Sequence, residues 1–223
     1  MKVILFGATG MVGQGVLREC LRDAAVESVL VVGRTPVGVS HPKLSEVVRA
    51  DLMELGEVEG ELSGYDACFF CLGVSSVGMK EDAYRRITYD LTLEVARSLG
   101  RWNPGLTFCY VSGQGTDASG RGRVMWARVK GETENALLAL DGVDAYMFRP
   151  GLIQPLHGVR SKTRLYQAIY SVTGFLLPVL RKLAPRRITT TEQVGLAMIV
   201  VARDGAAERV LETDGINQTA AAG

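Results

Sequence analysis

No stretch of this chain stays apolar over the length that a bilayer-spanning helix needs. The most apolar part, Leu165–Leu183, is interrupted by Gly174 and Pro178 and has lysines and arginines on both sides, whereas a spanning helix takes about 20 consecutive apolar residues. A charge excess is missing as well, because 25 basic residues stand against 24 acidic ones and leave a net charge of +1. We therefore expect neither an integral membrane protein nor a nucleic-acid-binding one, and favour small molecules as partners.

Cysteine is scarce, and nothing resembles a secretory signal. The four cysteines, at positions 20, 68, 71 and 109, lie in apolar contexts. Cys68 and Cys71 have the C-x-x-C spacing of redox motifs, but they fall inside a predicted strand rather than at a helix N-terminus. The first apolar run ends in glycine after four residues, which is too short for a signal peptide. We expect a cytoplasmic protein with reduced thiols and no metal site.

Strand and helix signals alternate along the chain, which predicts an α/β fold of the Rossmann type, with a doubly wound parallel sheet. The expected strands are Val3–Phe6, Val29–Val32, Leu44–Arg49, Asp66–Leu72, Leu106–Ser112, Ala145–Phe148 and Val210–Glu212. The expected helices are Met11–Leu21, Ala83–Leu99, Val124–Leu140 and Thr189–Ala202, the last with Thr191 as its N-cap, and Met53–Leu62 is a short helix or loop. The tail after Gln218 is expected to fray.

With 223 residues, the chain is long enough for one such domain. We expect a core over about residues 1–155, a small helical substrate lobe over about 156–190, and a final helix and strand over about 189–212. Three interpretations are open for Leu165–Leu183: a helix pair that caps the substrate cleft, a dimer surface, or a basic amphipathic membrane contact. A monomer and a homodimer are both compatible with the sequence.

The first thirteen residues carry the most specific signal. A buried strand, Val3–Phe6, leads into Gly7-x-x-Gly10-x-x-Gly13 and then into a helix, which is typical of a turn that binds a dinucleotide. Gly7 takes the tight turn, Gly10 leaves no Cβ between backbone and pyrophosphate, and Gly13 lets the helix pack on the strand. The helix start at Met11 and Val12 directs free N–H groups at the phosphates, and Thr9 adds a hydroxyl.

The end of the second strand indicates which dinucleotide is bound. An NAD site has an acidic side chain there to bind the ribose hydroxyls, whereas this chain has Arg34. A guanidinium can hold a 2′-phosphate, so the sequence predicts NADP(H) rather than NAD(H). At the next strand ends, Asp51 is expected to accept from the adenine amino group and Leu52 to pack on the ring, while Leu72 and Gly73 let the ribose approach.

Several motifs occur together in one order: Gly7-Ala8-Thr9-Gly10-Met11-Val12-Gly13, Val32-Gly33-Arg34, Tyr110-Val111-Ser112, Trp126-x-x-x-Lys130 and Phe148-Arg149-Pro150-Gly151. With these motifs the chain resembles the extended and atypical short-chain dehydrogenase/reductases. It is most similar to the NAD(P)H-binding branch of Tat-interacting-protein-like and NmrA-like proteins. The resemblance covers roughly residues 1–155.

The resemblance implies a reaction centre formed by a serine and a Tyr-x-x-x-Lys motif. Ser112 matches the serine that orients the substrate, and Lys130 matches the lysine that holds the nicotinamide ribose and lowers the pKa of the tyrosine. Position 126 is Trp126, whose indole exchanges no proton near pH 7 and therefore cannot act as the general acid. Pro150 fixes the chain as it leaves the sheet and is expected to contact the cofactor.

Other proton sources are open as alternatives to the missing tyrosine. Tyr84, Tyr89 and His157 are candidates, and so is water. Asp90 lies near the place where many family members have an asparagine that orders a relay water.

Two functions follow from the sequence. One is an NADP(H)-dependent reductase, or an epimerase/dehydratase-like enzyme, that acts on a small carbonyl or alcohol. The other is a non-catalytic NADPH-binding regulator or redox sensor that acts through a protein partner. A third hypothesis, a membrane-associated protein acting on a lipid or quinone, rests only on the apolar stretch around Phe175.

Overall fold

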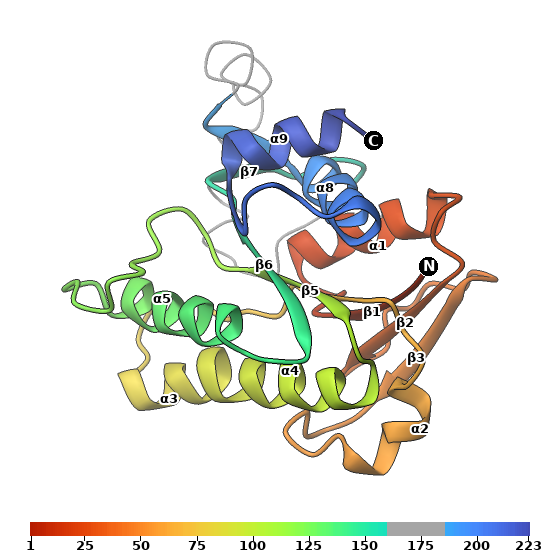
Figure 1. The fold of residues 1–223 in the computed structure, drawn as a ribbon, viewed down its shortest axis with the longest axis horizontal. Helices are drawn as coiled ribbons and strands as arrows, with labels where there is room; N and C mark the ends of the chain where they lie inside the picture. Colours follow the sequence, from red (N-terminus) through yellow and green to blue (C-terminus); the bar gives the residue numbers. More distant parts are fainter. Residues whose placement is uncertain (160–185) are drawn as a thin grey trace.

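The central element is a parallel sheet with the strand order β3-β2-β1-β4-β5-β6-β9 (Figure 1). In this computed structural model, residues 1–159 and 186–223 are described. The strands are β1 (Lys2–Phe6), β2 (Ser28–Gly33), β3 (Leu44–Val48), β4 (Ala67–Phe70), β5 (Leu106–Val111), β6 (Val143–Arg149) and β9 (Val210–Glu212). The chain moves outward from β1 to β3 and then returns to the other side of β1, so the strand order reverses between β1 and β4. Ligands bind at such a switch point in doubly wound sheets.

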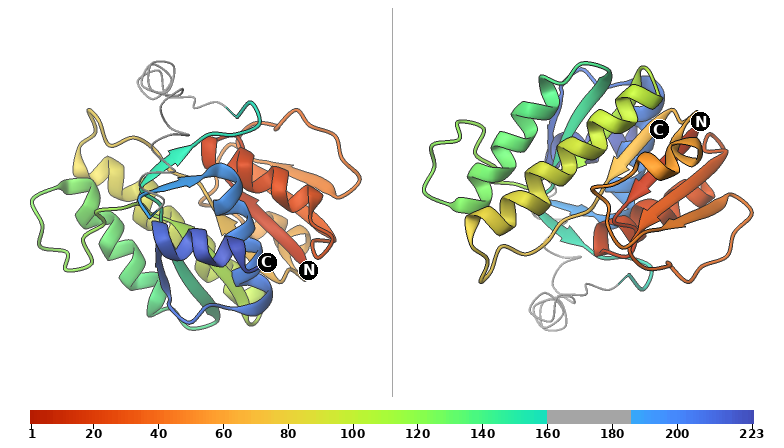
Figure 2. Two further views of the ribbon diagram at one scale, coloured as in Figure 1. Left: turned by 90° about the horizontal axis from the view of Figure 1, so that it is seen from above. Right: turned by 90° about the horizontal axis from the view of Figure 1, so that it is seen from below.

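Helices cover both faces of this sheet, which confirms the predicted Rossmann-like fold (Figures 1 and 2). One face carries α1 (Met11–Arg22), α8 (Thr191–Asp204) and α9 (Thr213–Ala221). The other carries α3 (Glu81–Arg85), α4 (Leu91–Trp102) and α5 (Met125–Leu138). Alternate residues of β1 point into the two layers: Ile4 and Phe6 lie in one core cluster, and Val3 and Leu5 in the other. Burial on both faces explains why the strands are apolar without alternation.

The predicted helix Ala83–Leu99 differs from the structure in its bounds and its regularity. A π-helical segment, Arg86–Asp90, joins α3 to α4, and the helical stretch ends at Trp102. Asn103 ends it by donating from its side-chain amide to the carbonyl oxygens of Leu62 and Leu99. The region predicted as a short helix or loop contains two short helical pieces, Gly56–Val58 and α2 (Glu59–Leu62).

The C-terminal part departs further from the sequence predictions. Thr190, rather than Thr191, caps α8, because its hydroxyl accepts from the Gln193 amide at 3.0 Å. The tail is not frayed: Thr213–Ala221 forms α9, which the fully buried Ile216 holds on the core. Two short strands, β7 (Leu152–Gln154) and β8 (Ile188–Thr190), pair in a second parallel sheet that was not predicted. The stretch Leu165–Leu183, with most of the predicted helical lobe, lies outside the described residues.

All four cysteines are free thiols. Cys68 is buried inside β4 and Cys71 follows that strand. Burial raises the pKa of both thiols above the usual range. Cys71 thus lies just beyond the strand that was predicted to hold both cysteines. The raised pKa values keep both thiols protonated, so the C-x-x-C spacing does not indicate a redox motif.

Candidate functional site

The glycine turn after β1 is shaped by close backbone approaches. Gly7 has a positive φ of 80°, and a Cβ on it would lie 2.6 Å from the carbonyl carbon of Cys71. A Cβ on Gly13 would lie 2.1 Å from the Gly7 carbonyl oxygen, so α1 can pack on this turn only through glycine. The Gly10 amide closes the turn by donating to the same oxygen at 2.9 Å.

The start of α1 has the properties of an anion-binding helix end. The first intrahelical bond runs from the Gln14 amide to the Gly10 carbonyl oxygen, so the amides of Met11, Val12 and Gly13 lack an intrahelical acceptor. The N-cap residue is Gly10, which has no side chain to cap this end, and the first turn holds no acidic residue. Around a Cβ built on Gly10, the Gly7 oxygen at 3.3 Å is the one described atom within 4 Å. The open space and the free donors fit a pyrophosphate group.

Thr9 also lies in this turn and is half-buried. Its carbonyl oxygen accepts from the Gln14 side chain at 3.2 Å, which ties the turn to the first part of α1. The predicted phosphate-contacting residues thus share one short segment.

Arg34 follows β2 directly and is exposed. Its guanidinium has no hydrogen bond or ion pair with any residue in 1–159 or 186–223. A cation that no described residue engages is available to an anionic ligand at this edge of the sheet.

The residues after β3 and β4 fit their predicted roles unequally. One carboxylate oxygen of Asp51 accepts from the Met53 amide at 2.8 Å, so that oxygen is used in a local turn. Leu52 is 5% exposed and belongs to the core, which leaves it little surface for a ligand ring. Leu72 packs partly against the same core. A Cβ on Gly73 would meet no described atom within 4 Å, so space is open there.

Ser112 and Lys130 lie together at the end of β5. The Lys130 ammonium group donates to the Ser112 carbonyl oxygen. The Ser112 hydroxyl donates instead to the Glu134 carboxylate at 2.5 Å, and its oxygen lies 3.2 Å from the Phe148 carbonyl oxygen. Ser112 is 6% exposed. The structure therefore brings the predicted serine and lysine together, but it directs the serine hydroxyl toward a buried carboxylate rather than toward a substrate.

Burial lowers the pKa of Lys130 to about 8, and the negative charge of Glu134 works against this shift. Near neutral pH the amine thus remains mostly protonated, and it becomes neutral as the pH rises through about 8. At neutral pH the charged Lys130 ammonium group can therefore donate hydrogen bonds to a ligand at the edge of the sheet.

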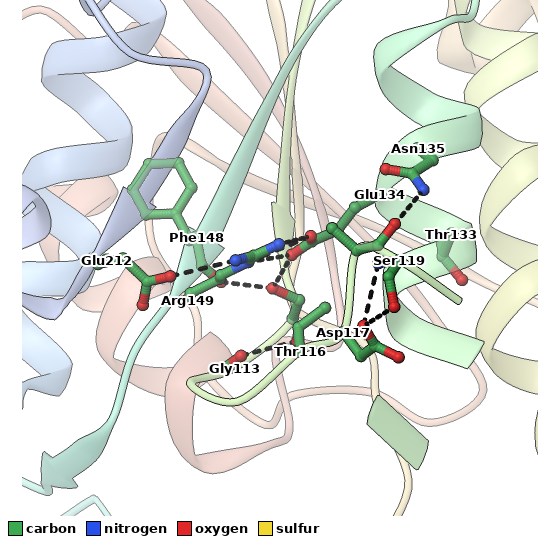
Figure 3. A network of polar contacts seen from close by, with 12 residues as sticks. Gly113, Thr116, Asp117, Ser119, Thr133, Glu134, Asn135, Phe148, Arg149 and Glu212 are labelled. Carbon is green, nitrogen blue, oxygen red and sulfur yellow. Dashed lines mark hydrogen bonds and ion pairs between the residues drawn. The ribbon is translucent and has the colours of Figure 1, made fainter. Parts of the chain in front are cut away.

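From the sequence, Arg149 was given no role of its own, and Glu134 was missed. Glu134 is 1% exposed and accepts from the Arg149 side chain at 3.0 and 3.1 Å (Figure 3). It also accepts from the Ser112 hydroxyl. A signal was present in the sequence, because Glu134 stands four positions after Lys130 and eight after Trp126. This spacing puts all three side chains on one face of α5.

Trp126 occupies the first turn of α5 and is half-buried. A Cβ on Gly115 would lie 3.7 Å from its Cη2 atom, so the indole lies beside the loop that follows β5. Pro150 is buried at the end of β6, and its carbonyl oxygen accepts from the Gln114 amide at 3.0 Å. This hydrogen bond links the loop after β5 to the end of β6.

The alternative proton sources are engaged elsewhere. Tyr84 is 2% exposed, and burial raises the pKa of its hydroxyl. The Tyr89 ring lies under the Arg85 guanidinium, 4.4 Å from it. His157 pairs with Glu192 of α8, with 2.5 Å between Nε2 and Oε2. Asp90 is exposed at the end of the π-helical segment.

No family model matches the chain. Its relatives include the protein fmp52-1, mitochondrial, of Aspergillus terreus, which is 31% identical over 180 residues that cover 78% of this chain and 75% of the relative. The protein FMP52, mitochondrial, of Debaryomyces hansenii is 28% identical, with coverage of 96% and 92%. The protein HTATIP2 of Rattus norvegicus is 28% identical, with coverage of 68% and 62%. The chain belongs to the atypical short-chain dehydrogenase/reductase superfamily.

Solved structures share the fold of this chain. A short chain dehydrogenase family protein from Francisella tularensis superimposes with a TM-score of 0.68 at 15% identity, covering 97% of this chain and 98% of that one. The enzyme WbmF of Bordetella bronchiseptica, in complex with NAD⁺, also has a TM-score of 0.68, at 16% identity, with coverage of 99% and 76%. At these identities the likeness establishes the Rossmann fold.

The prediction of a cytoplasmic protein is contradicted, because the Fmp52 relatives carry the description mitochondrial. That prediction relied on the lack of a secretory signal and on reduced cysteines, and neither feature distinguishes the cytoplasm from other compartments. Among the helices within 1–159 and 186–223, none combines the length and the apolar content needed to cross a bilayer.

Proposed function

We propose that this member of the atypical short-chain dehydrogenase/reductases binds a nicotinamide dinucleotide at the carboxyl edge of its sheet and prefers NADP(H) to NAD(H). The observation that carries the proposal is the open start of α1 after Gly10. At the end of the neighbouring strand β2, Arg34 is exposed and pairs with no described residue. WbmF, a protein of the same fold, holds NAD⁺ in its complex. The two features supply donors for a pyrophosphate and a cation for a 2′-phosphate.

Each residue has a distinct part in this proposal. Met11, Val12 and Gly13 donate their amides to the pyrophosphate, Arg34 binds the 2′-phosphate, and Lys130 binds the hydroxyls of the second ribose. The nicotinamide ring, when bound, supplies or accepts a hydride. Neither Trp126 nor Ser112 is arranged to move the accompanying proton, because the indole does not exchange one and the serine hydroxyl donates to Glu134.

The geometry therefore favours a protein that binds the cofactor but does not carry out the tyrosine-dependent reduction. Of the two functions expected from the sequence, this is the non-catalytic NADPH-binding regulator. Reduction of a small carbonyl compound stays as a second candidate. Lys130 favours it, because an ammonium group with a pKa of about 8 is able to release a proton near neutral pH.

Replacing Arg34 by alanine tests the cofactor preference. We expect the dissociation constant for NADPH to rise at least tenfold, since a charge-assisted contact with a phosphate contributes about 1.5–3 kcal/mol. The NADH affinity is expected to stay unchanged, because NADH carries no 2′-phosphate. Isothermal titration calorimetry with both cofactors measures the two values.

The matched control is Arg22→Ala, which removes an exposed arginine at the opposite end of α1. It should leave both affinities as they are. Equal affinity of the unaltered protein for NADPH and NADH would contradict the preference, and so would an Arg34→Ala protein that binds NADPH normally.

Trp126→Tyr separates the two functions. We expect the unaltered protein to oxidise no NADPH with a panel of aldehydes, ketones and quinones. The tyrosine variant should gain at least a tenfold rate over background with some member of the panel, because a positioned general acid accelerates such reactions by about 10²–10⁴. Absorbance at the nicotinamide band follows the reaction, and Trp126→Phe is the control that adds no proton. Turnover by the unaltered protein that Lys130→Ala abolishes would instead establish the reductase.

A further inference from the structure

Behind the candidate site lies a buried polar network that the proposed cofactor contacts do not use (Figure 3). Its centre is the carboxylate of Glu134, which is 1% exposed and faces β6 from α5. The Arg149 side chain donates to both of its oxygens, and the Ser112 hydroxyl donates to one of them. The other side of the Arg149 guanidinium reaches Glu212 at 3.2 Å. Several charge-assisted bonds hold this carboxylate in one position.

Ser112 is fixed through three of its atoms. Its amide donates to the Phe148 carbonyl oxygen at 2.9 Å, and its hydroxyl donates to Glu134. Its carbonyl oxygen accepts from the Lys130 ammonium group. The Lys130 amine is therefore attached to a residue that Glu134 holds, and Glu134 stands one helical turn after Lys130 on the same face of α5.

We propose that Glu134 is a positioning residue for Lys130: it fixes Ser112, whose carbonyl oxygen orients the ammonium group, and it places a negative charge one helical turn away on the same face of α5. This inference rests on the proposed role of Lys130 in binding the cofactor. Glu134 does not touch the cofactor. It acts through Ser112 and through the electrostatic field at Lys130.

Besides Glu212 of β9, which pairs with Arg149, the other ionisable groups around the network among the described residues are Arg149, Tyr110 and Tyr84. Arg149 of β6 is paired with Glu134, and this pairing raises the pKa of its guanidinium. Tyr110 of β5 and Tyr84 of α3 are buried, and burial raises the pKa of each hydroxyl, so both stay neutral. Glu134 is the residue whose charge counteracts the effect of burial on Lys130. Removing this charge should make Lys130 lose its proton at a lower pH.

The test measures the NADPH affinity of Glu134→Gln and of the unaltered protein by calorimetry between about pH 6 and 10, the range over which a lysine with a lowered pKa loses its proton. NADPH affinity of the unaltered protein should fall as the pH rises through about 8. For Glu134→Gln we expect an affinity about tenfold lower near pH 7.5 and a midpoint at lower pH. Glu134→Asp, which restores the charge, should return the midpoint toward the original value.

Glu132→Gln is the matched control. Glu132 lies on the same helix but pairs with Arg85 in a half-exposed ion pair, so its loss should change neither the affinity nor the midpoint. A Glu134→Gln protein that is less stable, yet has unchanged NADPH affinity and midpoint, would overturn the proposal and leave Glu134 a purely structural residue.

An NMR titration of ¹³C-labelled lysine in the cofactor-free protein gives a second readout, with the Lys130 signal assigned through Lys130→Arg. Glu134→Gln should lower the titration midpoint of Lys130, and an unchanged midpoint would refute the electrostatic part. If the unaltered protein fails to bind NADPH, the proposed function is wrong. The titration uses the cofactor-free protein, so it still decides whether Glu134 acts on the protonation of Lys130.

Ser112→Ala covers the case in which Glu134→Gln does not fold, because it keeps the ion pair between Glu134 and Arg149. It should weaken NADPH binding severalfold and leave the Lys130 midpoint unchanged, since the charge at position 134 remains. NADPH affinity equal to that of the unaltered protein would refute the transmission through Ser112.

Discussion

Replacing Gly13 by alanine is expected to lower the free energy of unfolding by about 3 kcal/mol, despite the better helix propensity of alanine. The added Cβ would lie 2.1 Å from the Gly7 carbonyl oxygen and 2.9 Å from the Ala8 Cα. Both neighbours are backbone atoms of the turn, so α1 as a whole has to move away from the sheet. Urea denaturation followed by circular dichroism measures the loss.

Gly10→Ala, three residues earlier, is the matched comparison. Gly10 has φ −80° and ψ 166°, which alanine adopts freely, and its Cβ would meet only the Gly7 oxygen at 3.3 Å among described atoms. We expect a stability loss below about 1 kcal/mol. NADPH affinity should nevertheless fall at least tenfold, because the methyl group enters the space proposed for the pyrophosphate.

The contrast between the two variants is the informative result. Unchanged NADPH binding by a well-folded Gly10→Ala protein would contradict the proposed phosphate site. A Gly13→Ala protein as stable as the parent would show that the turn adapts more easily than its geometry indicates.

Arg149→Met is expected to cost about 3–5 kcal/mol, because it leaves the carboxylate of Glu134 buried without its cation. The Arg149 side chain is 14% exposed and that of Glu134 is 1% exposed, so water cannot replace the lost partner. Chemical denaturation gives the difference in unfolding free energy. The substitution keeps most of the apolar volume of the side chain, so the loss reports the charge rather than a cavity.

Arg49→Met serves as the control for this prediction. Arg49 pairs with Glu57, whose side chain is 76% exposed, and such surface pairs contribute less than about 1 kcal/mol. Equal losses in the two variants would mean that the network around Glu134 contributes no more than a surface ion pair.

The strands of the main sheet could be predicted from the sequence because their burial restricts the residue types. Strands buried on both faces must be apolar throughout, and the helices between them must present one apolar face, so both leave periodic signals. The predicted last strand, Val210–Glu212, has the bounds of β9. The small sheet of β7 and β8 left no such signal, since strands of three residues are too short to show a period.

Local ambiguity explains the other errors. Thr190 and Thr191 are adjacent and chemically identical, and only the backbone conformation decides which hydroxyl reaches the Gln193 amide. The alanine-rich tail has little apolar bulk, and α9 forms because Ile216 finds a place in the core. The contact predicted between Leu52 and a ligand ring stays a prediction, although Leu52 is 5% exposed and lies in the core.

By itself, the sequence determined that the chain is an α/β protein of the Rossmann type and that its first turn must be built from Gly7 and Gly13. It did so because burial and close backbone contact restrict residue type directly. Only the tertiary structure decided how Ser112, Lys130 and Glu134 are used. Spacing along α5 puts two of these side chains on one face, but β6 supplies Arg149, and this cation makes Glu134 a buried acceptor that takes the serine hydroxyl. Such partners come from strands distant in sequence, so the direction of the Ser112 side chain could not be inferred before the chain was folded.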